Sequence, residues 1–145
     1  MRKKNAIREH WVAPYNKGEK PVDDEAYVEL AKWIEDIEDS TDENVEEYGD
    51  YSGDGNPKSE VISVSEKWTF TGTYDSEDEA QKLIAGMKRK TGDDRKLWHK
   101  IVQTDGQTVV GVATASEIIA GSGNALEFET FSCVLNYDNL PEVTP

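Results

Sequence analysis

Histidine and cysteine are the side chains most often used for metal binding and nucleophilic catalysis, and the chain has only three of them: His10, His99 and Cys133. Zinc sites usually combine several such ligands at close spacing, which these three residues do not provide. We expect Cys133 to be a small core residue, and His99, within KLWHKIVQ, to be a partly buried strand side chain. A pairing of Cys133 with a histidine is the alternative that depends on the fold, but no flanking residue indicates a nucleophile.

One segment has the beginning of a calcium-binding loop, DYSGDG at residues 50–55. Asp50, Ser52 and Asp54 would supply oxygen ligands at positions one, three and five. Position twelve, which needs a bidentate glutamate, is Val61. We therefore expect no calcium site. The sequence also lacks the common glycine-rich phosphate-binding loops, so we expect no cofactor and no enzymatic activity.

The charge of the chain narrows the classes of partner. With 16 basic and 30 acidic residues among 145, the net charge is −14, so the chain repels nucleic acids and anionic membranes. It could still surround DNA without binding to it, or mimic it.

The length indicates a single domain, residues 1–145. The lone cysteine excludes an internal disulfide, which fits a reducing cytoplasm. No apolar run is long enough to span a bilayer, and the basic start, MRKKNAIREHW, is not followed by the hydrophobic segment of a secretory signal.

The longest alternating segment begins at Val61 and predicts a strand with one buried and one solvated face. The apolar residues on one parity are Ile62, Val64, Trp68, Phe70 and Tyr74. Serine, threonine and lysine occupy the other parity. Glu66 interrupts the apolar parity, and Gly72 indicates a bend or a close backbone approach.

A helix over residues 77–90 follows this strand. Ser76 and Glu79 form a capping-box pattern at its start, and Gly92 is a candidate C-terminal cap. The predicted helix-on-sheet core combines one helical stripe with two strand residues: Ala80, Leu83, Ile84, Met87, Trp68 and Phe70.

The remaining alternating segments predict further strands: Ile7–Ala13, Leu97–Thr104, Thr108–Ile119 and Ala125–Tyr137. The Asp-Gly pair at 105–106 indicates a hairpin turn, and a change of apolar parity predicts a β-bulge near 129–130. The fold class is therefore mainly β, an antiparallel β-sandwich or barrel with one flanking helix. Residues 1–8 and 138–145 are expected to be extended arms.

Residues 35–54 contain ten acidic side chains and no basic one. We interpret them as a long acidic loop, about residues 38–57, or a loosely built hairpin. A solvated surface is the ordinary meaning of such a run, and a docking loop for a basic partner is the alternative. The preceding segment, Glu25–Ile37, fits both a helix and a strand, and local pattern slightly favours the helix.

The order of these elements resembles the major tail protein, or tail tube protein, of long non-contractile-tailed bacteriophages. The resemblance covers nearly the whole chain. It rests on YGDYSGDGN before the long strand, FTGTYDSEDEA where the helix begins, and the later strands beginning LWHK and ending LEFETFSCVLN. None of these motifs is catalytic.

The resemblance implies hexameric rings stacked into a hollow tube, with strands around the lumen and the helix outside. It also implies that Tyr27–Ile37 is a strand of a hairpin with the acidic loop at its tip. The implied partners are other copies of the chain, DNA in the lumen without specific binding, and tail proteins such as the tape measure, tail terminator and distal tail proteins. The implied location is the virion tail, after synthesis in the host cytoplasm. The alternative functions are an acidic DNA mimic that inhibits a host DNA-binding protein and a tube subunit of a contact-dependent secretion system.

Contacts between rings are the remaining expectation. We expect the acidic segment of one subunit to dock on a neighbouring ring, with the basic N-terminus helping to receive it. The candidate residues are Arg2, Lys3, Lys4, Glu38, Asp39, Asp42, Glu43, Glu46, Glu47, Asp50 and Asp54.

Overall fold

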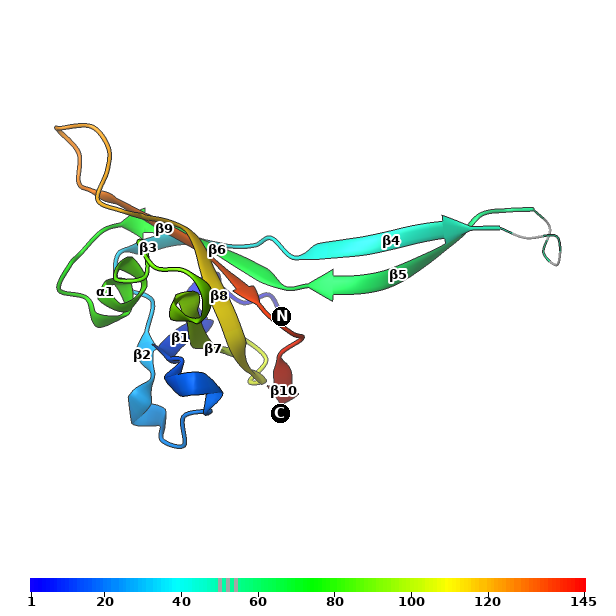
Figure 1. Cartoon of the computed structure of the whole chain (residues 1–145), viewed down its shortest axis with the longest axis horizontal. Helices are drawn as coiled ribbons and strands as arrows, with labels where there is room; N and C mark the ends of the chain where they lie inside the picture. The colour runs from blue at the N-terminus through cyan, green and yellow to red at the C-terminus, as the bar shows by residue number, and fades with distance from the viewer. Residues whose placement is uncertain (50, 52, 54) are drawn as a thin grey trace.

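A computed structural model of the chain describes residues 1–49, 51, 53 and 55–145. The structure is a body built on a curled antiparallel sheet, from which a two-stranded arm projects (Figure 1). The strands are β1 (Glu9–Pro14), β2 (Val28–Glu29), β3 (Ile34–Asp39), β4 (Asp42–Tyr48), β5 (Lys58–Ser65), β6 (Lys67–Thr73), β7 (Lys96–Val102), β8 (Thr108–Ala120), β9 (Thr130–Tyr137) and β10 (Glu142–Thr144). The α-helix is α1 (Glu79–Ala85), and short 3-10 turns lie at Asn5–Ile7, Asn16–Gly18, Asp24–Ala26 and Gly92–Arg95.

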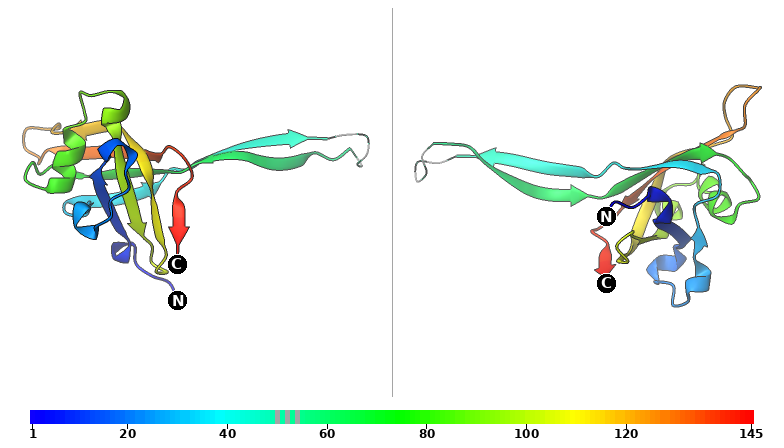
Figure 2. Two further views of the ribbon diagram at one scale, coloured as in Figure 1. Left: turned by 60° about the horizontal axis from the view of Figure 1, so that its bottom comes forward. Right: turned by 180° about the vertical axis from the view of Figure 1, so that it is seen from behind.

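The body sheet has the order β2-β1-β7-β8-β9-β6-β3, with β10 added to β8. Its strands alternate between inward apolar and outward polar side chains, as β7 and β9 show along their whole length. The sheet curls around α1, which packs on β8, β1 and β2. The fold class predicted from alternation is therefore confirmed: mainly β, antiparallel, with one helix against the sheet (Figure 2).

The helix is shorter than predicted, at both ends. Asp78, rather than Ser76, caps its start, because the Asp78 side chain accepts a hydrogen bond of 3.2 Å from the Gln81 backbone N–H. Its last residue is Ala85, and residues 86–89 continue as turns. Gly92 opens a 3-10 turn with a positive φ of 64° and is not the cap.

The first half of the predicted acidic loop over residues 38–57 is instead largely strand. Glu38 and Asp39 end β3, and Asp42–Tyr48 form β4, paired along its length with β5. Alternating hydrogen bonds satisfy the backbone, so a segment with almost no apolar residues still forms a regular ladder. The hairpin interpretation was correct, because β4 pairs antiparallel with β5.

The segment before the arm contains no helix longer than a 3-10 turn, and it is not one continuous strand. β2 and β3 are separated by a turn in which Trp33 has a φ of 67°. This turn brings the Trp33 carbonyl oxygen against Gly72 of the neighbouring strand β6. A Cβ atom on residue 72 would lie 2.0 Å from that oxygen, so only glycine fits there. The close approach predicted at Gly72 is thus confirmed.

Two further boundaries differ from the sequence prediction. The predicted bulge near 129–130 lies on the neighbouring strand, where the register shifts between Ser116 and Ile119 and Glu117 has a φ of 50°. The C-terminal arm is not free, because β10 pairs with Thr108–Val110 of β8. Residues before β1 are exposed, apart from the half-buried Arg8, and Ile7 belongs to a 3-10 turn and not to the first strand.

Candidate assembly surfaces

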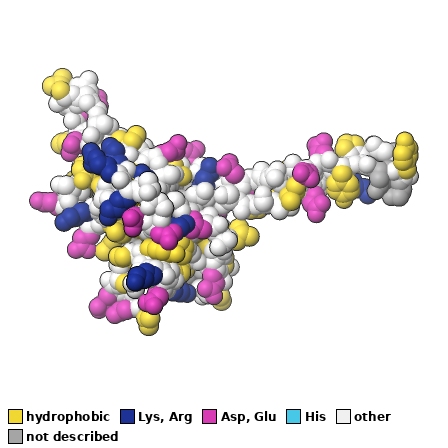
Figure 3. Space-filling model, in the orientation of Figure 1, with side chains coloured by type: hydrophobic (Ala, Val, Ile, Leu, Met, Phe, Trp, Pro, Cys, Tyr) yellow, Lys and Arg dark blue, Asp and Glu magenta, His cyan; other side chains and the backbone are white. Residues whose placement is uncertain are grey.

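The arm formed by β4 and β5 is exposed along almost its whole length, and its chain path leads away from the body (Figures 1 and 3). Four aliphatic side chains lie on it, and each is between 40% and 52% exposed: Val45, Val61, Ile62 and Val64. The sequence prediction of a buried face for Ile62 and Val64 is therefore wrong for the isolated subunit. Two strands alone supply nothing to cover either face of a hairpin.

The strand register gathers these aliphatic residues on one face. Val64 pairs with Glu43, and Val45 pairs with Val61. Directly paired residues point to the same side of a hairpin, and so do residues two apart in a strand. A register shift between Asn44 and Val45 places Ile62 as the extra residue beside Val61. We call this face, with Val45, Val61 and Val64, the apolar face of the arm.

Carboxylates surround the apolar face. Glu43 and Glu47 share it, and Glu46 pairs with Glu60 on the opposite face. The predicted contact residues Glu38, Asp39, Asp42, Glu43, Glu46 and Glu47 are all exposed on β3 or β4. Asp42 forms an ion pair of 2.7 Å with Lys67 at the base of the arm. Asp50 and Asp54, and Ser52 of the calcium-like motif, lie outside the described residues.

The basic N-terminus lies on the side of the body from which the arm leaves (Figures 1 and 2). Arg2, Lys3 and Lys4 are exposed, and the Lys3 ammonium donates a hydrogen bond of 2.7 Å to the Thr104 carbonyl. Within the described part of the subunit, no ion pair joins these three residues to the arm.

The predicted helix-on-sheet residues lie together. Trp68, Phe70, Ala80, Ile84 and Met87 belong to one buried cluster, and Leu83 packs half-buried against it. The sequence analysis missed Gln81, which is fully buried and connects the helix to the sheet by hydrogen bonds. Its side-chain oxygen accepts from the Asp75 N–H at 2.7 Å, and its amide donates to the Thr73 carbonyl at 3.0 Å.

His10 and His99 meet inside the body, which the sequence analysis did not predict. His10 Nδ1 lies 3.0 Å from His99 Nε2, and both side chains are at most 1% exposed. The signal was present in the alternation, since His99 shares the inward parity with Leu97 and Ile101. Burial, with a smaller effect of the Arg8 guanidinium, lowers the pKa of His10 from 6.5 to about 4. Burial also lowers the pKa of His99, so both imidazoles are neutral at pH 7.

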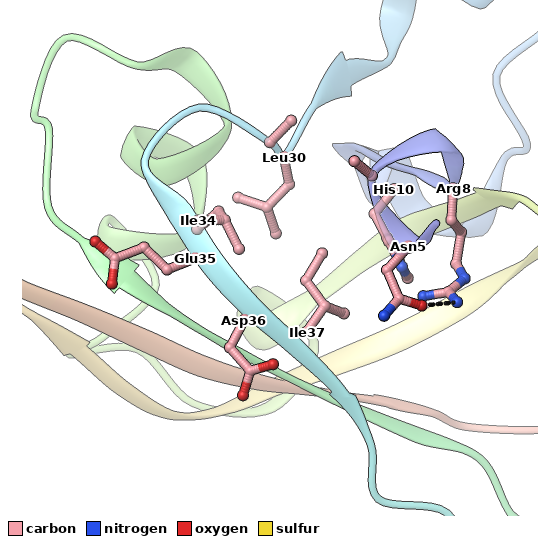
Figure 4. Close-up of a pocket in the computed structure, with 10 residues that line it drawn as sticks. Asn5, Arg8, His10, Leu30, Ile34, Glu35, Asp36 and Ile37 are labelled. Atoms are coloured by element: carbon pink, nitrogen blue, oxygen red, sulfur yellow. Dashed lines mark hydrogen bonds between the residues drawn. The ribbon is translucent and has the colours of Figure 1, made fainter. Parts of the chain in front are cut away.

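A hollow of about 320 Å³ lies beside His10, between β3 and the segment before β1 (Figure 4). Ile34 and Ile37 form its apolar wall, and Arg8 donates a hydrogen bond of 2.9 Å to Asn5 at its edge. His10 Nε2 has no protein hydrogen-bond partner among the described residues. The hollow brings no nucleophile to this imidazole. Cys133 is buried elsewhere in the core, where burial raises the pKa of its thiol to about 12.

The outward face of the body sheet is rich in hydroxyl groups. Paired positions across the strands place Glu38 beside Thr69, Thr69 beside Val134, and Val134 beside Ser116. The next row toward the arm joins Lys67, Asn136, Thr114 and Lys96. Both lysines of that row are paired, Lys67 with Asp42 and Lys96 with Asp138. This face therefore presents hydroxyls and carboxylates. Lys100, two positions further along the outward side of β7 than Trp98, is the third lysine of the face, and it is paired with Asp24.

The described residues contain no group of three or more potential metal ligands. Nor does this part of the chain contain a helix long and apolar enough to cross a membrane.

Comparison with known proteins identifies the fold. No protein-family model matches the sequence, and no curated protein matches it. Among solved structures, a chain from the tail of an empty gene transfer agent particle with C6 symmetry aligns over 99% of this chain and 100% of its own, with a TM-score of 0.71 at 11% identity. The chain has the fold of a virion tail subunit. A chain of the sheath–tube complex of an extracellular contractile injection system (PVC) aligns over 95% of this chain and 89% of its own, with a TM-score of 0.53 at 13% identity. A chain of the tube-terminating cap of the anti-feeding prophage aligns with a TM-score of 0.52, also at 13% identity, over 93% of this chain and 87% of its own.

Proposed function

We propose that the chain is a structural tail tube protein that assembles into stacked hexameric rings and forms the conduit for DNA. The observation that carries the proposal is the arm. It is a two-stranded ladder whose aliphatic side chains remain 40–52% exposed in the described part of the subunit. A two-stranded hairpin is marginally stable alone, so the apolar face of the arm needs a neighbour. The full-length likeness to a tail with C6 symmetry supports copies of the same chain as that neighbour.

The outward face of the body sheet is our candidate for the lumen surface. A protein that neutralises phosphates binds DNA by releasing counterions. Among the described residues, Lys67, Lys96 and Lys100 of this face are each paired with an aspartate, so DNA phosphates would find none of these three cations unpaired. Hydroxyl groups and carboxylates would leave DNA hydrated and mobile. The tape measure, tail terminator and distal tail proteins are the further partners that this role implies.

A second candidate is a tube subunit of an injection or secretion machine, which the likeness to the PVC sheath–tube chain favours. The two functions differ in cargo and not in the subunit fold. Mass spectrometry of purified DNA-containing particles separates them, because only the first function places the chain in such particles.

The test of tube formation replaces residues 43–64 by Asn-Gly. Asp42 and Ser65 are paired at the base of the arm, so this dipeptide can close a two-residue hairpin there. Negative-stain microscopy of the unchanged protein is expected to show six-fold rings and tubes. The shortened protein is expected to keep a cooperative thermal unfolding transition but form no long tubes. Tubes of normal length without the arm would contradict the proposal.

The contribution of the basic N-terminus is tested separately. Reversing Arg2, Lys3 and Lys4 to glutamate is expected to shorten tubes, and the effect should weaken as salt rises, because exposed charges are screened over about 10 Å at 0.1 M salt. Unchanged tube length at low salt would remove the N-terminus from the contact.

A further inference from the structure

A second groove on the body has the composition that the apolar face of the arm requires. It is a hollow of about 480 Å³ between the end of α1 and the loop that follows β1. Leu83 and Met87 from the helix side and Pro14 and Tyr15 from the loop supply its apolar surface. We call this hollow the helix-end groove.

Lysines border the helix-end groove from both sides. Lys17 stands on the loop side, and Lys90 stands on the helix side, next to the exposed Lys88 and Arg89. Lys96 also reaches the groove but is paired with Asp138. No ion pair involves the side chain of Lys17 or Lys90 within the described residues. Two aspartates, at 93 and 94, share the border and offset part of this charge, but Lys88, Arg89 and Lys90 together leave the helix side net positive.

The helix side of the groove is fixed by Arg95. Its guanidinium donates hydrogen bonds to the carbonyls of Lys88 at 2.6 Å, Lys90 at 2.8 Å and Ala115 at 3.2 Å. The turn that carries the basic residues is thereby tied to β8. A surface whose backbone is already held loses less conformational entropy on binding.

The loop side is held as well. The Trp98 indole donates a hydrogen bond of 3.1 Å to the Tyr15 carbonyl. Asn16 and Lys17 have φ values of 49° and 55°, a left-handed conformation that is uncommon for non-glycine residues. Such a conformation persists only where its surroundings impose it, and it often marks a functional surface. Here it presents Lys17 at the edge of the groove.

The arm offers the complementary surface. On β4, Glu43, Val45 and Glu47 alternate along one face, and the aliphatic residues of β5 lie beside them. An apolar centre bordered by carboxylates thus matches an apolar floor bordered by lysines. The arm cannot reach the groove of its own subunit, because α1 lies at the end of the body away from the arm (Figures 1 and 2).

We infer that the helix-end groove receives the arm of a second copy of this chain, with Glu43 and Glu47 of the arm facing Lys17 and Lys90 of the groove. The two surfaces differ, so the contact is heterologous and repeats from copy to copy, as a ring or a tube needs. The inference rests on the proposed self-assembly and names the receiving surface, which is distinct from the basic N-terminus.

Intermolecular crosslinking tests the inference without requiring tubes. One preparation carries Glu47→Cys and the other carries Lys90→Cys. The native Cys133 is buried, so it is not expected to form intermolecular disulfides. Mixing the two under mild oxidation is expected to give a disulfide-linked dimer on a non-reducing gel. Lys3→Cys in place of Lys90→Cys is the matched control, since Lys3 belongs to the competing basic surface.

Charge reversal shows whether the contact is the one described. Lys17→Glu, introduced with Lys90→Cys, is expected to reduce dimer yield about tenfold, and adding Glu43→Lys to the arm preparation should restore it. A dimer with Lys3→Cys but not with Lys90→Cys would overturn the inference in favour of the N-terminus. Absence of any dimer, although the unchanged protein forms tubes, would also overturn it and leave the tube function standing. A specific dimer without tubes would support the groove contact and count against the tube.

Discussion

The arm and the body use the same strand pattern with opposite outcomes. In β6, Trp68 and Phe70 are 9% and 0% exposed, whereas Ile62 and Val64 in the preceding β5 are 50% and 40% exposed. β6 lies between β3 and β9 and faces the core, but β5 has only β4 beside it. Alternation therefore shows that one face of a strand is to be covered, and it does not show which molecule covers it.

The largest expected effect distinguishes β6 of the body from β5 of the arm. Phe70→Ala removes a fully buried ring and is expected to cost about 3–5 kcal/mol of unfolding free energy. Val61→Ala in the arm is the matched control, with an expected change within about 0.5 kcal/mol, as for other surface positions. Urea unfolding followed by tryptophan fluorescence measures both. A cost of several kcal/mol for Val61→Ala would mean that the arm is already covered in the isolated protein.

Acid should destabilise the body through the histidine pair. His10 has a pKa of about 4 in the fold against 6.5 when exposed, so the unfolded chain binds a proton that the folded chain excludes. Stability should fall as the pH drops through 6.5 and level off below about 4. The shift corresponds to a loss of about 3 kcal/mol. Thermal melts between pH 7 and pH 4 measure it.

Two controls bear on the acid effect. Arg8→Gln should raise the pKa of His10 and so reduce the loss, because the Arg8 guanidinium is the nearby positive charge that opposes protonation. The arm contains no histidine, so the Asn-Gly variant without residues 43–64 should lose as much stability as the full chain. Equal stability at pH 7 and pH 4.5 would show that the pair is not held neutral.

The smallest expected effect lies at the border between the core and the proposed groove. Leu83 is only half-buried, so Leu83→Ala is expected to cost about 1–2 kcal/mol, less than the 2–5 kcal/mol typical of a buried leucine. Ile84→Ala, one residue along and fully buried, is the comparison and should cost more. Thermal melts of the two variants rank them. An equal cost would mean that Leu83 belongs to the core and is not available to a second copy.

The sequence by itself determined the local elements of the body. Period-two alternation predicted the later strands of the body sheet, and the Asp-Gly pair predicted the turn between β7 and β8. These signals are local, because pleat geometry and turn chemistry act within a few residues. The sequence also indicated a bend or a close backbone approach at Gly72, but it did not indicate that Trp33 is the residue approached.

Only the tertiary structure decided what each face and each polar residue meets. The histidine pair joins residues 89 positions apart in the chain, and no local pattern encodes which inward positions of two strands come together. The calcium-like motif lies in part outside the described residues. The acidic segment became the strand β4 because β5 pairs with it from Asp42 to Tyr48, although its own composition favours a loop. The groove at the helix end forms where α1 ends at Ala85 and Arg95 ties the next turn to β8. Such outcomes depend on which strands become neighbours, and that is a property of the whole chain.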